Sequence, residues 1–414
     1  MTTEAAPPGS GLFYGWFVVA AAFTITFIGF GSAYTFSAFL EPLQADFGAS
    51  RGSVSLVFSL AGFLYFGLGI VSGSLADRWG TRRLVILGML LTGAGLAAAS
   101  VANSLEVVYV AYGLGIGLGI GCAYVPTLGA VQRWFVRRRG LASGIASSGI
   151  GVGTLVMPPA ASYLIAAFGW RDAYLLLGGF AAIAGAGVAL VLVSHPRDRG
   201  LAPDGDQPQE DIRSAPLTGL TVSQAMRTRS FTVLYLSSLI ASFGVFVPFV
   251  HLVPYAQDHG IPKATAVLLL GMIGIGSTAG RFMLGGIADR LGRRNAPIIM
   301  FLGMALALAI WFGSSTFWPL AVSALLFGIF YGGWVAVLPA VVMDHFGGRH
   351  ISSIIGVLYT SFSIGTLVGP TAAGMAFDIN HSYTVPILVC VVTNVIAAII
   401  AAFDAGKDVS GSRA

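Results

Sequence analysis

Long apolar stretches alternate with short polar segments along almost the whole chain. Twelve of them are roughly 18 to 28 residues long, and a helix of about 20 apolar residues crosses the ~30 Å hydrocarbon core of a bilayer. They lie at about 13–40, 53–76, 84–102, 104–132, 140–167, 172–194, 230–257, 264–288, 296–313, 317–343, 351–377 and 383–403. The pattern predicts an all-α polytopic membrane protein with twelve transmembrane helices.

Composition and charge agree with this class. Apolar residues make up 56% of the chain and charged residues 9%, with a mean hydropathy of +0.84. If the N-terminus is cytoplasmic, eighteen of the 22 lysines and arginines face the cytoplasm, and Arg51, Arg171 and Lys263 face outward. This distribution obeys the positive-inside rule. We expect a multi-pass protein of a bacterial-type cytoplasmic (inner) membrane with both termini inside, partnered by the lipid bilayer and by no nucleic acid.

The chain repeats itself with an offset of 212 residues. EPLQADFG at 41–48 matches VPYAQDHG at 253–260, and GTLVMP at 153–158 matches GTLVGP at 365–370. A repeat of this kind is typical of transporters built from two related bundles. The sequence thus predicts two pseudo-symmetric six-helix bundles. The expected segments are a cytoplasmic tail at 1–12, bundles at 13–194 and 230–404, a cytoplasmic linker at 195–229 and a second tail at 405–414.

One motif occurs in both halves, as GSLADRWGTRR at 73–83 and GGIADRLGRRN at 285–295. With this motif the chain resembles the major facilitator superfamily over its full length. The resemblance implies that these inner loops latch the two bundles together on the cytoplasmic side during alternating access. The residues concerned are Gly73, Asp77, Arg78, Gly80, Asp289 and Arg290. A purely structural role, as an orientation signal and a tight turn, is the alternative.

Arg281 is the only lysine or arginine in the interior of an apolar stretch. A charge at that depth costs at least ~2.5 to 3.5 kcal/mol on insertion scales, so it is expected to face a cavity and to have a partner. Every aspartate and glutamate lies at a helix end, in a loop or in a tail. The missing anion is therefore predicted to be the ligand. The alternative is structural, with Arg281 bonded to backbone carbonyls or holding the two bundles together.

A closer resemblance, to the monocarboxylate transporters and the neighbouring oxalate/formate group, rests on three places. They are YGW at 14–16, RWFVRRRGLASGIA at 133–146, and Arg281. In that family the arginine receives the substrate carboxylate. Animal members also carry an aspartate one turn before the arginine and a lysine in the first span, where this chain has Ser277 and Tyr34. Their proton route therefore cannot simply be transferred.

Other polar and aromatic residues are candidates to line a substrate site with Arg281. Tyr124 lies in a glycine-rich span, where small neighbours leave room for its hydroxyl to reach a substrate. Tyr331, Trp334, Tyr359 and Ser147 are similar candidates. Packing, or a belt at the membrane surface, is the alternative for each aromatic residue. As a set they fit a small amphipathic organic acid.

His251, between Pro248 and Pro254, is the candidate for proton coupling, because imidazole titrates near neutrality. The alternative is a neutral histidine that is hydrogen-bonded at the outer rim. No lysine or arginine occurs between Ile351 and Asp378, where the oxalate/formate group is expected to place a second cation. One cation should therefore hold one carboxylate.

These features predict a secondary active transporter that moves a small lactate- or pyruvate-like monocarboxylate with a proton by alternating access, as a functional monomer. An oxalate/formate-type anion exchanger is the alternative, and a non-transporting membrane sensor is a weaker one. No nucleophile and base set, metal-ligand cluster or phosphate-binding loop is evident in the sequence. Neither an enzyme nor a metal or other cofactor is therefore expected.

Overall fold

The structure is a computed structural model that describes residues 13–205, 219–291, 295–347 and 350–405. Helices form most of this chain. The first half contains α1 (Gly15–Tyr34), α2 (Phe36–Phe47), α3 (Arg51–Gly67), α4 (Gly69–Trp79), α5 (Thr81–Ser100), α6 (Leu105–Trp134), α7 (Arg139–Phe180), η1 (Ala181–Gly185) and α8 (Ala186–Ala189). The second half contains α9 (Val222–Met226), α10 (Arg229–Val245), α11 (Val247–Asp258), α12 (Lys263–Ala266), α13 (Leu268–Leu291), α14 (Ala296–Phe312), α15 (Phe317–Phe346), α16 (Ile351–Asn380) and α17 (Thr384–Ala405).

These helices make the twelve predicted crossings. α1 with α2, α10 with α11, and α12 with α13 each form one crossing, and α3 meets α4 at a bend of 47°. α7 contains parts of two crossings that meet at Gly169, where a φ of +84° reverses the chain and favours glycine. α14 is short for a crossing, at 17 residues. The prediction of an all-helical protein with twelve spans is confirmed. The apolar pattern did not indicate that some single spans are broken into two helices.

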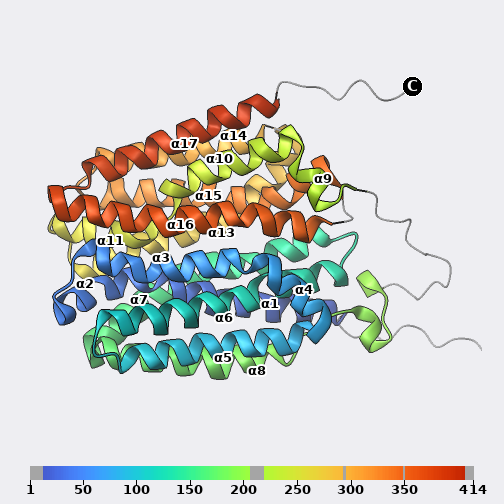
Figure 1. The fold of residues 1–414 in the computed structure, drawn as a ribbon, viewed down its shortest axis with the longest axis horizontal. Helices are drawn as coiled ribbons and strands as arrows, with labels where there is room; N and C mark the ends of the chain where they lie inside the picture. Colours follow the sequence, from blue (N-terminus) through green and yellow to red (C-terminus); the bar gives the residue numbers. More distant parts are fainter. Residues whose placement is uncertain (1–12, 206–218, 292–294, 348–349, 406–414) are drawn as a thin grey trace, which may run out of the picture.

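The two halves of the chain lie on opposite sides of the bundle, with α1 to α8 on one side and α10 to α17 on the other (Figure 1). They meet where α3 packs on α16 and α7 packs on α13. Glycines bring these backbones into contact. A Cβ atom at Gly374 would lie 2.8 Å from Gly52 Cα, and one at Gly274 would lie 2.5 Å from the carbonyl oxygen of Gly151. Small residues thus allow the two halves to touch backbone to backbone.

The bundle has two ends, which are distinguished by the linker. We call the end that carries residues 195–205 and 219–229 the linker end and the opposite end the far end (Figure 1). At the linker end Leu220 N–H donates to Phe346 O at 2.9 Å, and the Asp204 carboxylate accepts from the amides of Val136 and Arg137 at 3.0 and 2.9 Å. The start of the linker is therefore fixed to the first half and its last part to the second half.

The two halves are joined at the far end by a cluster of charged groups centred on Arg51. Its guanidinium donates two hydrogen bonds to Asp258, at 2.5 and 2.7 Å, and a third to the Tyr383 hydroxyl at 3.1 Å. Asp378 accepts from the backbone amides of Arg51 and Gly52, at 2.9 and 2.8 Å. These two amides begin α3, so a carboxylate from α16 caps the positive end of the α3 dipole. We call these residues the far-end latch.

Candidate functional site

A cavity lies between the two halves, midway along the bundle. The first half contributes Phe30, Phe66, Tyr124 and Ile150 to its walls. The second half contributes Phe246, Tyr331, Trp334, Val335, Leu338, Tyr359 and Phe362. The empty volume is about 400 Å³, of which a part is open to solvent. Four of the predicted site residues, Tyr124, Tyr331, Trp334 and Tyr359, are therefore brought together in one cavity.

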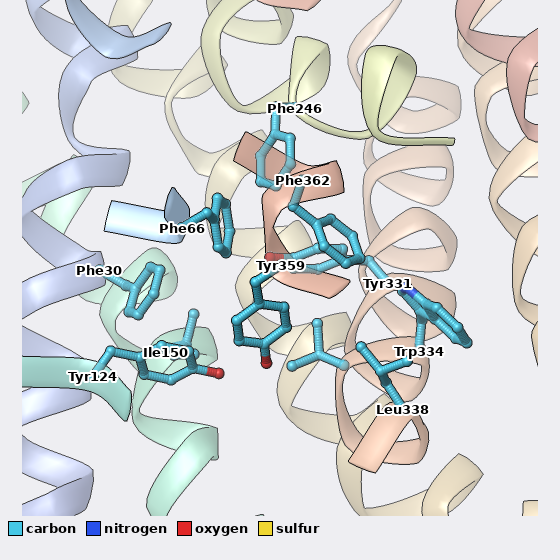
Figure 2. A pocket seen from close by; sticks show the side chains of 11 residues that line it. Phe30, Phe66, Tyr124, Ile150, Phe246, Tyr331, Trp334, Leu338, Tyr359 and Phe362 are labelled. Atoms are coloured by element: carbon cyan, nitrogen blue, oxygen red, sulfur yellow. The ribbon is translucent and has the colours of Figure 1, made fainter. Parts of the chain in front are cut away.

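Aromatic rings from the two halves face one another across this cavity (Figure 2). The ring of Tyr124 lies nearly parallel to that of Tyr359, with centroids 6.3 Å apart and an angle of 18° between the planes. The ring centroid of Phe66 lies 5.8 Å from those of both Tyr359 and Phe362. The glycine-rich part of α6, which carries Tyr124, packs closely on α3, since a Cβ atom at Gly117 would lie 2.6 Å from Leu64 Cβ.

Arg281 lies beside the cavity and is 3% exposed. Its Nη1 donates a hydrogen bond of 2.7 Å to the backbone carbonyl of Ser147 on α7, in the opposite half. In the part of the chain that the structure describes, its Nε and Nη2 are buried and have no hydrogen-bond partner. One nitrogen of Arg281 thus binds a backbone carbonyl and ties the two halves together, as in the structural alternative. The other two remain able to donate to a ligand.

Arg281 itself does not line the cavity wall, although it lies at the same depth. α13 and α15 run in the same direction, and Gly332 contacts the backbone of Ser277 while Gly333 contacts the side chain of Leu284. Arg281 lies between these two positions of α13, so it is level with the part of α15 that carries Trp334. Arg281 is also close enough to interact electrostatically with the phenols of Tyr331, Tyr124, Tyr34 and Tyr359.

Unpaired polar atoms lie at about the same depth of the bundle as this arginine. Within the described residues, Trp334 Nε1, Ser277 Oγ and Thr278 Oγ1 are buried without a hydrogen-bond partner. Leaving a buried donor without an acceptor costs about 1 to 3 kcal/mol. Trp334 Nε1 and the two nitrogens of Arg281 can only donate, while the two hydroxyls can donate or accept, so unused donors predominate here. A ligand with acceptor oxygens is the chemical complement of such a region.

Ser147 contributes differently from the prediction. Its backbone carbonyl binds Arg281, while its hydroxyl donates to Gly144 O at 3.2 Å within the same helix. Tyr34, which stands where animal monocarboxylate transporters carry a lysine, has its hydroxyl 3.3 Å from that of Tyr331. Its ring stacks on Phe249 with centroids 4.4 Å apart. Tyr34 lies about one helical turn beyond Phe30, which lines the cavity.

His251 lies away from the cavity and contacts Tyr383 of the far-end latch. It is fully buried, with Nε2 2.8 Å from Pro370 O and Nδ1 2.9 Å from the Tyr383 hydroxyl. A carbonyl oxygen can only accept, so Nε2 carries a proton and, in the neutral ring, Nδ1 accepts from Tyr383. Tyr383 in turn accepts from Arg51. The histidine is thus linked to the ion pair that joins the halves.

The inner-loop motif is described only in part. Gly80 ends α4 with a φ of +86°, and its N–H donates to Ala76 O at 2.8 Å. Gly73 is in ordinary contact with Val125, and Arg78 is exposed in the last turn of α4. The side chains of Asp77, Asp289 and Arg290 lie outside the described residues. A latch at the linker end therefore stays a prediction.

Sequence reasoning missed most of the apolar wall. Phe30, Phe66, Phe246 and Phe362 are four of 28 phenylalanines, and a wall residue has the same pattern as a core residue. It also missed the role of Arg51, although the repeat singled out Asp258. Among the described residues, no group of three or more His, Cys, Asp or Glu side chains could hold a metal ion.

Comparison with known proteins gives the family. The model described as "Major Facilitator Superfamily" matches residues 21–314 and 234–411. "Monocarboxylate transporter 11" of Mus musculus is 31% identical over 398 residues, which is 93% of this chain and 86% of the relative. "Monocarboxylate transporter 12" of Rattus norvegicus is 30% identical over 425 residues, which is 97% and 87% of the two chains.

A solved structure supports the fold. The inward-facing, unoccupied form of a bacterial homolog to the human lysosomal transporter Spinster superposes with a TM-score of 0.69 over 95% of this chain and 97% of the other. The two sequences are 18% identical, so this likeness concerns the fold alone. Taken with the twelve helices and the sequence relatives, the chain belongs to the major facilitator superfamily and is related within it to the monocarboxylate transporters.

Proposed function

We propose that the protein is a secondary active transporter that moves a small monocarboxylate, of the lactate or pyruvate kind, together with a proton by alternating access. One observation carries this proposal. Arg281 is buried between the two halves with two donor nitrogens unused, and no aspartate or glutamate of the described chain pairs with it. A planar guanidinium with two free donors matches a carboxylate.

The charge of the site favours one carboxylate over two. α16 crosses beside the cavity through Tyr359 and Phe362, and it contains no lysine or arginine. Arg281 would therefore neutralise a monoanion and leave the second charge of a dianion unpaired. An oxalate/formate-type exchanger remains the second candidate because the fold and the arginine would be shared.

Coupling to a proton would remove an electrical penalty. A small carboxylic acid is almost entirely anionic at neutral pH, and moving one charge against the membrane potential costs roughly 2.3 kcal/mol per 100 mV. His251 supports this part of the proposal because its Nδ1 is bound only by a phenol. A proton on Nδ1 would end its acceptance from Tyr383 and so disturb the far-end latch. Anion and proton binding would then favour each other through the conformational equilibrium.

The far end is the extracellular side in this proposal, which places both termini in the cytoplasm of a bacterial-type cell. In this proposal the contacts of Arg51 with Asp258 and of its backbone amide with Asp378 would keep the outer side closed. One chain contains both halves of the site, so a monomer is sufficient. Alternating access would open the far-end latch and close the linker end.

The test is uptake of labelled acetate, lactate, pyruvate and oxalate into proteoliposomes, with and without a pH gradient that is acidic outside. The proposal predicts that uptake of a monocarboxylate rises with the gradient and that oxalate is excluded. Uptake of oxalate in exchange for internal formate, unaffected by the gradient, would instead establish the anion exchanger. Empty liposomes provide the control for diffusion of the neutral acids.

A further inference from the structure

We infer that the preferred substrates are 2-oxo or 2-hydroxy monocarboxylates with an aromatic or comparably bulky apolar side group, such as phenylpyruvate and 3-phenyllactate, rather than lactate and pyruvate. This inference rests on the proposed function, since it takes carboxylate transport as given. It concerns the part of the substrate that Arg281 does not hold. Three features of the cavity carry it.

The first feature is the chemistry of the walls. Eight of the eleven lining residues are aromatic, and Ile150, Val335 and Leu338 complete the lining. Lactate offers these walls a single methyl group, which can cover little of any ring. An aryl group offers two faces and an edge, and rings gain by edge-to-face and offset-stacked contact beyond the area they bury. A wall made of rings therefore favours a substrate that carries one.

The second feature is the extent of the cavity wall. It reaches across the interface, from Phe30 and Tyr124 of the first half to Phe246 and Phe362 of the second half. An aryl-substituted 2-hydroxy acid has about twice the number of non-hydrogen atoms of lactate. Such a body would span from the donors near Arg281 to rings of both halves, for example Phe66 and Phe362, which lie 5.8 Å apart.

The third feature is a donor that a simple carboxylate leaves unused. Arg281 Nε and Nη2 can each meet one carboxylate oxygen, but Trp334 Nε1 is also buried without a partner in the described chain. Trp334 of α15 lines the cavity and lies at the same depth as Arg281 of α13. An oxygen on the carbon next to the carboxylate supplies the third acceptor. The site would thus bind the 2-oxo or 2-hydroxy carboxylate group of the substrate at one end and its ring at the other.

The first experiment is a comparison of substrates. Labelled 3-phenyllactate and labelled lactate are taken up separately by proteoliposomes, corrected with empty liposomes, and each is competed with the other, with 3-phenylpropionate and with 3-phenyllactamide. We expect half-maximal competition by 3-phenyllactate at a concentration at least about ten-fold lower than by lactate, which corresponds to about 1.4 kcal/mol. 3-Phenylpropionate should compete less well, because it lacks the 2-oxygen. The amide should not compete.

The second experiment uses variants that separate the two ends. Phe66→Leu and Phe362→Leu should reduce the preference for 3-phenyllactate over lactate. Phe39→Leu is the matched control, because it removes an equally buried ring that stacks on Tyr174 outside the cavity, at 3.9 Å. Trp334→Phe keeps a ring and removes the donor, so it should abolish the preference for 3-phenyllactate over 3-phenylpropionate. Ratios of substrates are compared within each variant, which cancels differences in expression and folding.

The outcomes are distinguishable. If lactate and pyruvate are transported and aryl acids compete no better than acetate, the inference fails while the proposed function stands. If the amide competes as well as the acid, the carboxylate is not recognised and the inference also fails. If no carboxylate is transported, the proposed function fails and the inference with it. An aryl preference that falls equally in Phe39→Leu would show that these rings do not set specificity.

Discussion

Arg281 Nη1 donates a hydrogen bond of 2.7 Å to the backbone carbonyl of Ser147, and this bond joins α13 of one half to α7 of the other. The residue expected to bind the substrate is therefore also a tie between the halves. An arriving carboxylate can bind Nε and Nη2 of the guanidinium whose Nη1 holds Ser147. Substrate binding is thereby connected to the interface that must move.

The close approach of α7 and α13 is needed for this geometry. At Gly274 a Cβ atom would lie 2.5 Å from Gly151 O and 2.6 Å from Leu155 N, both of which are backbone atoms. Gly274→Ala is therefore expected to destabilise the protein by about 1 to 3 kcal/mol and to reduce transport. The measurement is the midpoint of thermal unfolding in detergent, with transport in proteoliposomes.

Gly179→Ala is the control for that substitution. Gly179 is also helical and lies in α7, but no atom is within 4 Å of its added Cβ. Alanine there should be neutral or stabilising by up to about 1 kcal/mol, because it favours the helix. Equal melting points for Gly274→Ala and Gly179→Ala would show that the close approach is not needed.

The far-end latch is expected to hold the outer side closed. Arg51→Ala removes hydrogen bonds to Asp258 and Tyr383, and bonds to charged groups are worth about 1.5 to 3 kcal/mol each. We expect the outward-open population to rise about ten-fold or more. A cysteine placed at Ser59, which is buried and bonded to Thr371 at 2.9 Å, reports this opening through its rate of labelling by a membrane-impermeant maleimide.

The matched control is Arg171→Ala. Arg171 pairs with Asp46 at 2.8 Å within the first half, so its loss should leave the labelling rate unchanged. Both variants are made in a protein whose free cysteines, Cys122 and Cys390, have been replaced. Labelling that is no faster in Arg51→Ala than in Arg171→Ala would refute the role of the latch.

His251 is expected to carry the coupled proton. His251→Gln retains hydrogen-bonding groups but cannot titrate, so substrate-driven alkalinisation of the medium should be lost while exchange of labelled anion across the membrane persists. His259 is exposed and follows the end of α11, so His259→Gln should leave both the alkalinisation and the anion exchange unchanged. One proton per anion at the normal rate in His251→Gln would mean that the proton travels with the substrate at Arg281.

The sequence was sufficient for the helices and for the burial of Arg281, because apolar length and the cost of an unpaired charge act locally. The sequence also pointed to four residues that line the cavity, Tyr124, Tyr331, Trp334 and Tyr359, since polar atoms inside a span are few. The Arg51 and Asp258 pair was not, because its partners lie 207 residues apart and no periodicity fixes the register between halves. Which nitrogens of Arg281 remain without a partner depends on the position of the Ser147 carbonyl. That position is set by the packing of α7 on α13.

The central claim is that Arg281 binds the substrate carboxylate. Its most direct test is calorimetry with the monocarboxylate that shows the highest uptake, added to purified wild-type, Arg281→Lys and Arg281→Ala protein. Uptake by the same three proteins is measured in proteoliposomes. Lysine keeps the charge but loses the planar pair of donors. We expect binding to weaken at least about ten-fold in Arg281→Lys and to disappear in Arg281→Ala, with normal membrane insertion. Undiminished binding and uptake in Arg281→Ala would contradict the claim.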